Sequence, residues 1–306
     1  VAWGDNGGGQ CSVPAPDTGF TAIAAGGRHS LGLTSAGMIV AWGDNTYGQC
    51  AVPAPNARFA AVAAGDIHSL GLKTDGRIVA WGYNDFGQCN VPAPNTDFLA
   101  VAGGLGHSLG LKADGTIVAW GYNASGQCAV PAPNSGFTAI AGGYLHSLGL
   151  KADGAIVAWG YNDFGQCNVP APNTGFTAVA GGTLHSLALR PGGVIVAWGS
   201  NDLGQCTVLS PDAAFAKVAA GGYHSLGLLG PPAGACCRPD STCTLTLQAE
   251  CRSPNSWLGA AMPCRPNPCP LTPVLFESWA AASLAEGLQL RWEVPIGTTG
   301  ALYRVW

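Results

Sequence analysis

The hydrophobic pattern of this chain consists of short apolar segments separated by glycine, proline and asparagine. Such segments, of which Ile39-Val40-Ala41-Trp42 is one, are typical of short β-strands joined by tight turns. In the first complete stretch we expect four antiparallel strands in a meander, over residues 21–25, 29–33, 38–42 and 50–52. Because apolar and polar residues do not alternate cleanly within them, both faces of each sheet should be covered.

This pattern recurs with a period of 39 residues and without insertions over the first three quarters of the chain. Two sets of residues carry the period: Trp3, Trp42, Trp81, Trp120, Trp159 and Trp198, and His29, His68, His107, His146, His185 and His224. A repeat of this length is the signature of a solenoid or a propeller. The Asp-Gly pairs between the second and third strands, as at Asp75-Gly76, suit a tight hairpin.

Packing each small sheet between two neighbours would cover both of its faces, which is the β-propeller arrangement. The sixth unit contains a His-Ser-Leu strand but no Ile-Val-Ala-Trp-Gly strand after it, whereas the chain starts with Val1-Ala2-Trp3-Gly4. We therefore expect an all-β, six-bladed propeller closed by the N-terminal strand. The alternative is that the sequence is cut from a parent with more blades.

The composition changes after residue 229. A Gly-Pro-rich linker starts at Gly230, and six cysteines follow within a short stretch: Cys236, Cys237, Cys243, Cys251, Cys264 and Cys269. Their density predicts a small knot of three disulfides whose connectivity the sequence does not give. Zinc is the competing interpretation, but paired C-x-x-C motifs and histidines are missing from this segment.

Segments 274–279, 288–294 and 301–306 resemble the opening strands of an incomplete β-sandwich of the fibronectin or immunoglobulin kind. The predicted domains are thus a propeller over residues 1–229, a linker and cysteine-rich segment over 230–270, and the start of a sandwich over 271–306.

Charged residues make up only 10% of the chain. Residues 1–229 hold eight Lys or Arg against twelve Asp and no Glu. A mildly acidic repeat region argues against nucleic-acid binding, which needs clustered Lys and Arg. No segment is apolar for long enough to span a membrane as a helix. The chain starts inside a repeat, so any targeting signal is expected to lie outside this fragment.

Several repeated polar residues could suggest chemistry. His29 and Ser30 with nearby Asp44 contain the residue types of a nucleophilic triad, but the His-Ser pair recurs six times, whereas catalysis needs one converging site. We expect the histidines to bond backbone near strand starts, and neither they nor the Asp-Asn loops to bind zinc or calcium. The loop asparagines and glutamines should satisfy loop backbone. The repeated cysteines are expected to be small buried hydrophobes, too far apart to pair: Cys11, Cys50, Cys89, Cys128, Cys167 and Cys206.

The most informative positions are those at which the units differ from one another. They lie after Trp-Gly and immediately before His, and strand parity places both on one face, opposite the uniform Asp-Gly hairpins. The first set is Asp44, Tyr47, Tyr83, Phe86, Tyr122, Tyr161, Phe164 and Leu203. The second set is Arg28, Ile67, Leu105, Tyr144, Leu145, Leu184 and Tyr223. A varied, aromatic-rich rim on a uniform scaffold favours a binding surface, although loops also vary where little packs on them.

The motifs W-G-x-N-x-x-G-Q and G-G-x-x-H-S-L-x-L resemble the repeat of the regulator of chromosome condensation family over three quarters of the chain. The compact period with V-P-A in the linker is similar to bacterial members such as the type II β-lactamase inhibitory protein, which has seven blades. This resemblance implies a propeller that binds proteins. Guanine nucleotide exchange, the activity of the eukaryotic namesake, is not expected, because the insertions and basic tail it uses are missing here.

Together these patterns predict a non-catalytic protein-interaction module without cofactor, extracellular or attached to the surface of a bacterial cell. The alternatives are a carbohydrate-binding propeller, in which tyrosines stack on sugars, and an enzyme with a site in the central channel. The enzyme would need one unit to carry charged residues that the others lack, and only Asp66 and Arg190 depart in this way.

Overall fold

A computed structural model describes residues 1–208 and 214–230 and, of the rest of the chain, six strands between residues 234 and 305. The chain divides into two compact units, Val1–Gly230 and Pro231–Trp306. Every regular element of the described residues is a β-strand, which confirms the all-β class. No helix among these residues is long and apolar enough to cross a membrane.

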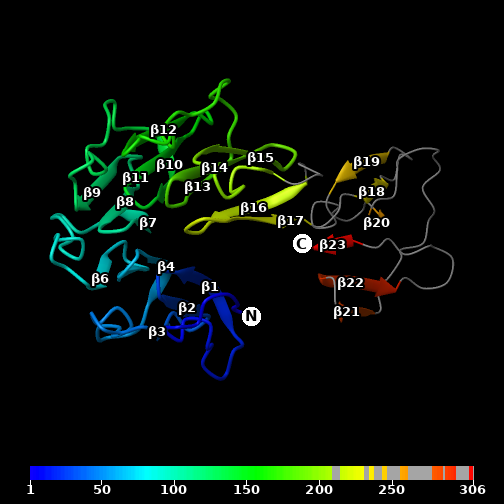
Figure 1. The fold of residues 1–306 in the computed structure, drawn as a ribbon, viewed down its shortest axis with the longest axis horizontal. Helices are drawn as coiled ribbons and strands as arrows, with labels where there is room; N and C mark the ends of the chain where they lie inside the picture. The colour runs from blue at the N-terminus through cyan, green and yellow to red at the C-terminus, as the bar shows by residue number, and fades with distance from the viewer. Residues whose placement is uncertain are drawn as a thin grey trace. The chain divides into compact units, whose positions relative to one another are not determined.

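The first unit contains six antiparallel sheets, one for each sequence repeat (Figure 1). Five of them have three strands in sequential order. The first three sheets are β1 (Phe20–Ala25), β2 (His29–Thr34) and β3 (Ile39–Gly43); β4 (Phe59–Ala64), β5 (His68–Lys73) and β6 (Ile78–Gly82); and β7 (Phe98–Gly103), β8 (His107–Lys112) and β9 (Ile117–Gly121). The others are β10 (Phe137–Gly142), β11 (His146–Lys151) and β12 (Ile156–Gly160); β13 (Ala178–Gly181), β14 (His185–Arg190) and β15 (Val194–Gly199); and the pair β16 (Phe215–Ala220) and β17 (Ser225–Leu229).

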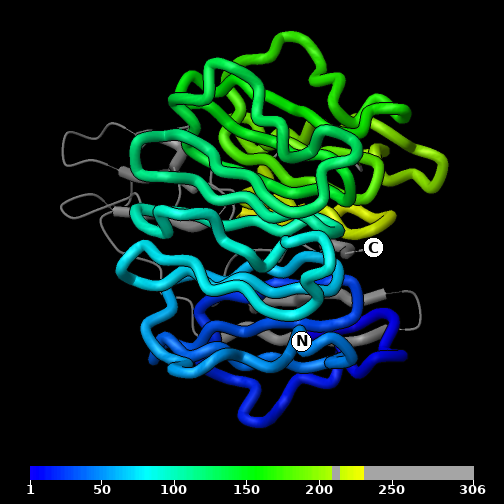
Figure 2. The backbone as a smooth tube through the Cα atoms, turned by 90° about the vertical axis from the view of Figure 1, so that its left-hand side faces the viewer, coloured from blue at the N-terminus to red at the C-terminus, as the bar shows by residue number. Residues whose placement is uncertain are grey.

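The sheets follow one another around an arc from β1–β3 to β16–β17, each with its faces turned to its neighbours (Figures 1 and 2). Four core clusters lie between consecutive sheets. In one of them Leu70 and Ile78 of the second sheet pack against Phe98 and Trp120 of the third. This arrangement gives the apolar residues a partner on either face and confirms the propeller architecture.

The hairpins between the second and third strands have the predicted geometry. Gly76, after Asp75, has φ of 78°, a value at which glycine avoids the steric clash of a side chain. The Gly76 carbonyl also accepts a hydrogen bond from the Phe98 N–H, 3.0 Å away, at the start of β7. Each hairpin is thereby tied to the entry of the next sheet.

Two predictions about the strands are wrong. The segment 50–52, predicted as a fourth strand, is a turn followed by an irregular stretch. Its backbone donors are used locally: the Cys50 N–H donates to Asn45 Oδ1 (2.8 Å), and the Ala51 N–H donates to the Gly48 carbonyl. Closure by the N-terminal strand is not formed either. Residues 1–4 contain no strand and Trp3 is 77% exposed, and among the described strands β17 pairs with β16 alone.

The missing closure has a physical explanation. A complete third strand begins with a buried isoleucine, such as Ile39, whose backbone N–H and carbonyl both bond the Asn56 side chain at 2.8 Å. Val1 aligns with Val40, so residues 1–4 contain no counterpart of that isoleucine. In this structure residues 1–4 have neither the buried isoleucine nor the two side-chain hydrogen bonds that hold β3, and they form no strand beside β17. Leu226 and Leu228 remain 49% and 61% exposed, whereas their counterparts Leu31 and Leu33 are buried.

The second unit is described only through the backbone of its strands. One sheet has the order β19-β18-β20, with β18 (Gly234–Cys237), β19 (Cys243–Thr246) and β20 (Ser256–Ala260), and Cys237 lies opposite Cys243 in its register. The other has the order β21-β22-β23, with β21 (Ser278–Leu284), β22 (Gly287–Glu293) and β23 (Tyr303–Val305). Cys251, Cys264 and Cys269 lie outside the described residues, as do residues 274–277 of the first predicted sandwich strand, so the disulfide knot stays a prediction.

Candidate protein-binding face

The two sets of varied loops are direct neighbours in the structure. We call residues 44–47, 83–86, 122–125, 161–164 and 200–203 the Trp-Gly loops, and residues 27–28, 66–67, 105–106, 144–145, 183–184 and 222–223 the pre-His loops. The Tyr83 N–H donates to the Ile67 carbonyl (3.0 Å), and the Tyr161 N–H donates to the Leu145 carbonyl (2.9 Å). Both loop sets therefore form one surface, the variable face, at the strand ends opposite the hairpins.

A row of aromatic rings crosses the variable face from the first sheet to the third. The ring centroids of Tyr47 and Tyr83 are 5.0 Å apart, those of Tyr83 and Phe86 are 5.8 Å apart, and those of Phe86 and Tyr122 are 4.8 Å apart. These are edge-to-face or tilted contacts of the kind that stabilises aromatic pairs. Tyr47 and Phe86 are 51% and 47% exposed, so the row offers apolar area that the propeller itself does not cover.

The row stops after Tyr122. The next position that could extend it is Ser125, where the neighbouring units have Phe86 and Phe164. A separate aromatic pair follows, Tyr161 and Phe164, with centroids 6.3 Å apart. The variable face thus carries two aromatic patches, and the serine separates them.

The pre-His loops join neighbouring sheets by backbone hydrogen bonds. The Gly27 N–H donates to the Asp66 carbonyl (3.0 Å), and the Tyr144 N–H donates to the Gly182 carbonyl (3.1 Å). Tyr144 and Tyr223 remain 39% and 58% exposed. These bonds fix the backbone of the pre-His loops while leaving two tyrosine side chains available to a partner.

The remaining predicted residues lie on the same face with different exposure. Leu203 is exposed at 70%, and the Arg28 side chain is also exposed. Asp44 is half-buried and accepts hydrogen bonds from both the N–H and the hydroxyl of Thr46. The half-buried aliphatic members of the face are Ile67, Leu105, Leu145 and Leu184.

Carboxylates accompany the aromatic rings, and two of them, Asp85 and Asp163, were not among the predicted residues. A hydrogen bond with Asp85 raises the pKa of Tyr83, and one with Asp163 does the same for Tyr161. Burial raises the pKa of Asp66. The motif Tyr-Asn-Asp-Phe, shared by the second and fourth Trp-Gly loops, was the available signal for Asp85 and Asp163.

Side-chain amides hold the Trp-Gly loops in place, as predicted. Asn84 Oδ1 accepts the Cys89 N–H at 2.8 Å, and Gln88 Oε1 accepts the Phe86 N–H at 3.1 Å. The half-buried Cys89 thiol donates to the Tyr83 carbonyl, with 3.4 Å between Sγ and oxygen. Such internal bonds reduce the entropy that a loop loses when it binds a partner.

The repeated His-Ser pairs form contacts between consecutive sheets. His68 Nε2 lies 2.9 Å from Ser108 Oγ of the next unit rather than from its own neighbour Ser69, and both side chains are buried. The same contact recurs at 2.9–3.1 Å for His29, His107, His146 and His185. The expectation that these histidines bond backbone through the ring is therefore wrong. The contacts tie consecutive sheets together.

Comparisons with known proteins agree with this architecture. Residues 20–49, 59–88, 98–127 and 137–166 match the regulator of chromosome condensation (RCC1) repeat family. No curated protein sequence matches the chain significantly.

Three similar solved structures share the fold. Prp20p from Saccharomyces cerevisiae, whose structure was reported with its binding to Gsp1p and histones, is 22% identical with a TM-score of 0.62, over 72% of each chain. Yeast RCC1 (Prp20) bound by Kap60 is 21% identical with a TM-score of 0.60, over 71% of this chain and 69% of that one. The ectodomain of the Arabidopsis thaliana receptor kinase ACR4 is 24% identical with a TM-score of 0.56, over 69% of this chain and 75% of that one. The fold of residues 1–230 is thus that of a β-propeller, and four of its units match the RCC1 repeat.

Proposed function

We propose that this propeller is a non-catalytic module that binds another protein through its variable face. The observation that carries the proposal is the aromatic row from Tyr47 to Tyr122, in which Tyr47 and Phe86 are about half exposed, on loops that are already hydrogen-bonded. Aromatic side chains supply much of the affinity in protein interfaces, and an ordered backbone lowers the entropy lost on binding.

The fold neighbours give this proposal a context. Prp20p binds Gsp1p and histones, and yeast RCC1 is bound by Kap60, as their structures report. Identity to these proteins is 21–22%, so the shared feature is the propeller, and the partner of this chain depends on its own loops.

The absence of catalysis is part of the proposal. The His-Ser contacts lie inside the propeller, recur from sheet to sheet, and leave both side chains inaccessible to substrate. A nucleophilic site would need a base, a nucleophile and an oxyanion site that meet at one accessible place.

We further propose an extracellular or cell-surface location, on the basis of the cysteine-rich second unit. The unpaired thiols of the propeller are compatible with an oxidising environment. Burial raises the pKa of Cys89, Cys128 and Cys167 to about 11, so that little of the reactive thiolate forms at neutral pH.

The test first identifies a binding partner and then measures how substitutions in the variable face alter its affinity. A purified partner is first identified by site-specific crosslinking from Phe86, and its affinity is measured by calorimetry for the wild type and for the triple variant Tyr83→Ala, Tyr122→Ala, Tyr161→Ala. We expect the triple variant to bind at least tenfold more weakly, with unchanged circular dichroism. The matched control is Asp114→Ala with Asp153→Ala, on two exposed hairpins, which should leave the affinity unchanged.

Equal affinity of the triple variant and the wild type would refute the proposed face. Half-exposed tyrosines in a row are also suited to stacking on sugar rings, so the same proteins are applied to a glycan array. Saturable glycan binding that the triple variant loses, without any crosslinked protein, would replace the protein partner with a carbohydrate.

A further inference from the structure

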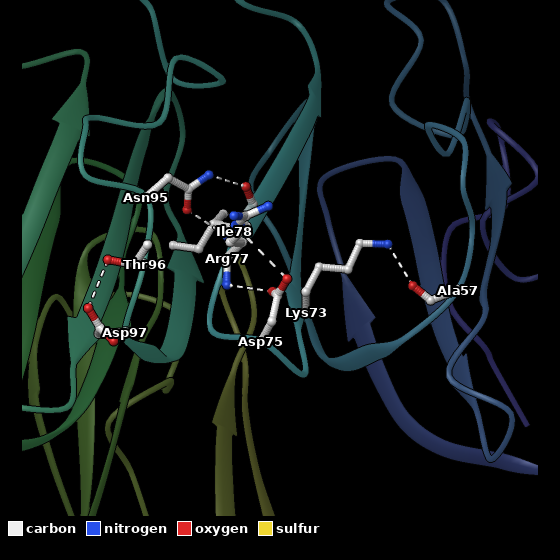
Figure 3. A network of polar contacts seen from close by, with 8 residues as sticks. All are labelled: Ala57, Lys73, Asp75, Arg77, Ile78, Asn95, Thr96 and Asp97. Carbon is white, nitrogen blue, oxygen red and sulfur yellow. Dashed lines mark hydrogen bonds and ion pairs between the residues drawn. The ribbon is translucent and has the colours of Figure 1, made fainter.

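A cleft of about 510 Å³ lies on the hairpin side of the second sheet, away from the variable face. Its polar walls come from the loop before β4 and from the β5–β6 hairpin, and they include Arg58, Lys73, Asp75 and Arg77. Its apolar walls include Pro55 and Val79. Figure 3 shows the hairpin side chains of this region with Ala57 and Asn95 beside them.

The charge of this cleft is not repeated at the equivalent positions of the other units. Two arginines and a lysine against one aspartate give the four polar positions a net charge of +2. The counterparts in the next unit are Asp97, Lys112, Asp114 and Thr116, with a net charge of −1. In the two units after that the net charge is 0 and +1. The concentration of cations is therefore a property of this cleft and not of the repeat.

Arg58 occupies a backbone position that disfavours it. Its φ is 59°, in the left-handed region. Three counterparts in other units are glycines (Gly19, Gly136 and Gly175, φ of 71–83°), and two are Asp97 (65°) and Ala214 (71°). A side chain at such a position is destabilising by roughly 1 kcal/mol relative to glycine. The backbone position itself does not call for an arginine, and the Arg58 guanidinium adds a positive charge to the lining of the cleft.

The guanidinium groups of Arg58 and Arg77 have N–H donors that are free to bind a ligand, whereas the Lys73 ammonium already donates to backbone carbonyls. Lys73 Nζ donates to the carbonyls of Pro55 (3.0 Å) and Ala57 (2.6 Å), as shown in part in Figure 3. Arg77 approaches only Asp75, with 3.9 Å between Nε and Oδ2, and the pair is exposed. Within the described part of the chain, no hydrogen bond or ion pair engages the Arg58 guanidinium.

We propose that this cleft binds a small molecule through a doubly charged tetrahedral oxyanion, phosphate or sulfate. Arg58 and Arg77 would each present two N–H groups to the oxygens, the geometry in which guanidinium groups bind oxyanions best. Lys73, which also lines the cleft, adds positive charge, and the apolar part of the ligand would lie against Pro55 and Val79. The site is separate from the variable face, so its test does not depend on the protein partner.

The test uses inorganic phosphate and sulfate as probes, titrated into the whole chain at constant ionic strength with chloride as the control anion. Binding is followed through the Nε–Hε signals of the arginines in ¹H–¹⁵N spectra. We expect saturable shifts of Arg58 and Arg77 at millimolar phosphate or sulfate, and tighter binding of phenyl phosphate than of inorganic phosphate because of the apolar walls. The variants Arg58→Gly and Arg77→Thr introduce residues found at the same positions of other units, and each should weaken binding at least tenfold.

Two further variants make the outcome decisive. Lys217→Gln removes an exposed cation elsewhere and should leave binding unchanged. Asp97→Arg with Thr116→Arg copies the arginines into the next unit and should create a second site. Shifts that do not saturate, or equal binding by the wild type, Arg58→Gly and Arg77→Thr, would overturn the proposal.

Discussion

His68 of the second repeat lies with Nε2 at 2.9 Å from Ser108 Oγ of the third repeat. Ser108 uses its one hydroxyl proton to donate to the Gln88 carbonyl, 2.9 Å away. The serine oxygen can therefore only accept from the histidine, which places a proton on Nε2 of His68. Because burial lowers the pKa of His68 to about 3, the imidazole is neutral at physiological pH. The Trp120 indole N–H donates to the same Gln88 carbonyl at 2.9 Å, so two side chains of the third repeat bond one backbone oxygen of the second.

Removing the serine of such a contact should destabilise the propeller. Ser108→Ala leaves the buried His68 N–H without an acceptor, and we expect a loss of about 1–3 kcal/mol in the free energy of unfolding. The control is Ser30→Ala, because Ser30 donates to the Gln10 carbonyl but receives no histidine from a preceding sheet. Urea unfolding should show a smaller loss for Ser30→Ala, and equal losses would contradict the role of the histidine.

Acid should destabilise the propeller through these histidines. Burial lowers the pKa of His68 to about 3 and that of His107 to about 4, whereas the unfolded chain has the ordinary value of 6.5. Below pH 6.5 the unfolded state binds more protons than the folded state, so stability is complete above that pH and is lost as the pH falls toward the folded pKa. Each such histidine should contribute up to about 1.4 kcal/mol per pH unit.

The measurement is urea unfolding from pH 7.5 to 4.5 in wild type and in His107→Gln. The glutamine variant should be less stable at pH 7.5 but should lose stability less steeply as the pH falls. Identical pH slopes would show that His107 is not responsible for the acid sensitivity.

The contribution of a repeat tryptophan to the free energy of unfolding should depend on whether a neighbouring sheet packs against it. Trp120 is 6% exposed and packs against Leu70, Ile78 and Phe98. Trp120→Gly should cost at least about 3–5 kcal/mol, the range for removing a buried tryptophan. Trp3→Gly changes an exposed residue and should have almost no effect on the unfolding midpoint; a large effect there would mean that Trp3 is packed in solution.

Arg58→Gly should stabilise the propeller while it weakens the proposed oxyanion site. Glycine removes the strain of a left-handed φ of 59°, and we expect a gain of about 1 kcal/mol or slightly less, since glycine also increases the entropy of the unfolded chain. The reverse change at an equivalent position, Gly136→Arg, should be destabilising by a similar amount. Thermal unfolding of both variants tests this, and a loss of stability in Arg58→Gly would contradict the strain.

The propeller thiols should react slowly while the protein is folded. With pKa values of about 11, Cys89, Cys128 and Cys167 are almost entirely protonated at pH 8. A colorimetric disulfide reagent should modify them far more slowly than it modifies the same protein in urea. Equal rates in the folded and unfolded states would show that the thiols are accessible and ionised.

The sequence predicted the elements that depend on local chemistry. The strands around His68 and Ile78 and the Asp-Gly hairpins could be read from apolar runs and turn residues. The sequence also placed Tyr83 and Ile67 on one face. Each follows an odd-numbered strand of its meander, and such strands run in the same direction and end on the same side. The amide roles of Asn84 and Gln88 were also predictable, since they act within a few residues of their own positions.

Features that depend on distant residues were not predicted. The hydrogen-bond partner of His68 is 40 residues away, whereas the sequence alone suggested a backbone partner close to His68 in the chain. The interruption of the aromatic row at Ser125 could not be predicted, because it depends on how far apart the rings of adjacent loops lie. The expected pairing of residues 1–4 with β17 followed from pattern matching alone, whereas a third strand such as β3 is held by bonds to Asn56, 17 residues further along the chain.

Each core cluster is built from two sheets, with leucine and isoleucine supplied by one and phenylalanine and tryptophan by the next. Removing a whole period of 39 residues would bring the same two kinds of surface together again. A deletion of any other length would place unlike positions against each other. The molecule should therefore accept changes in length only in whole units, and a shortened chain lacking one internal repeat should keep the junctions of all those that remain.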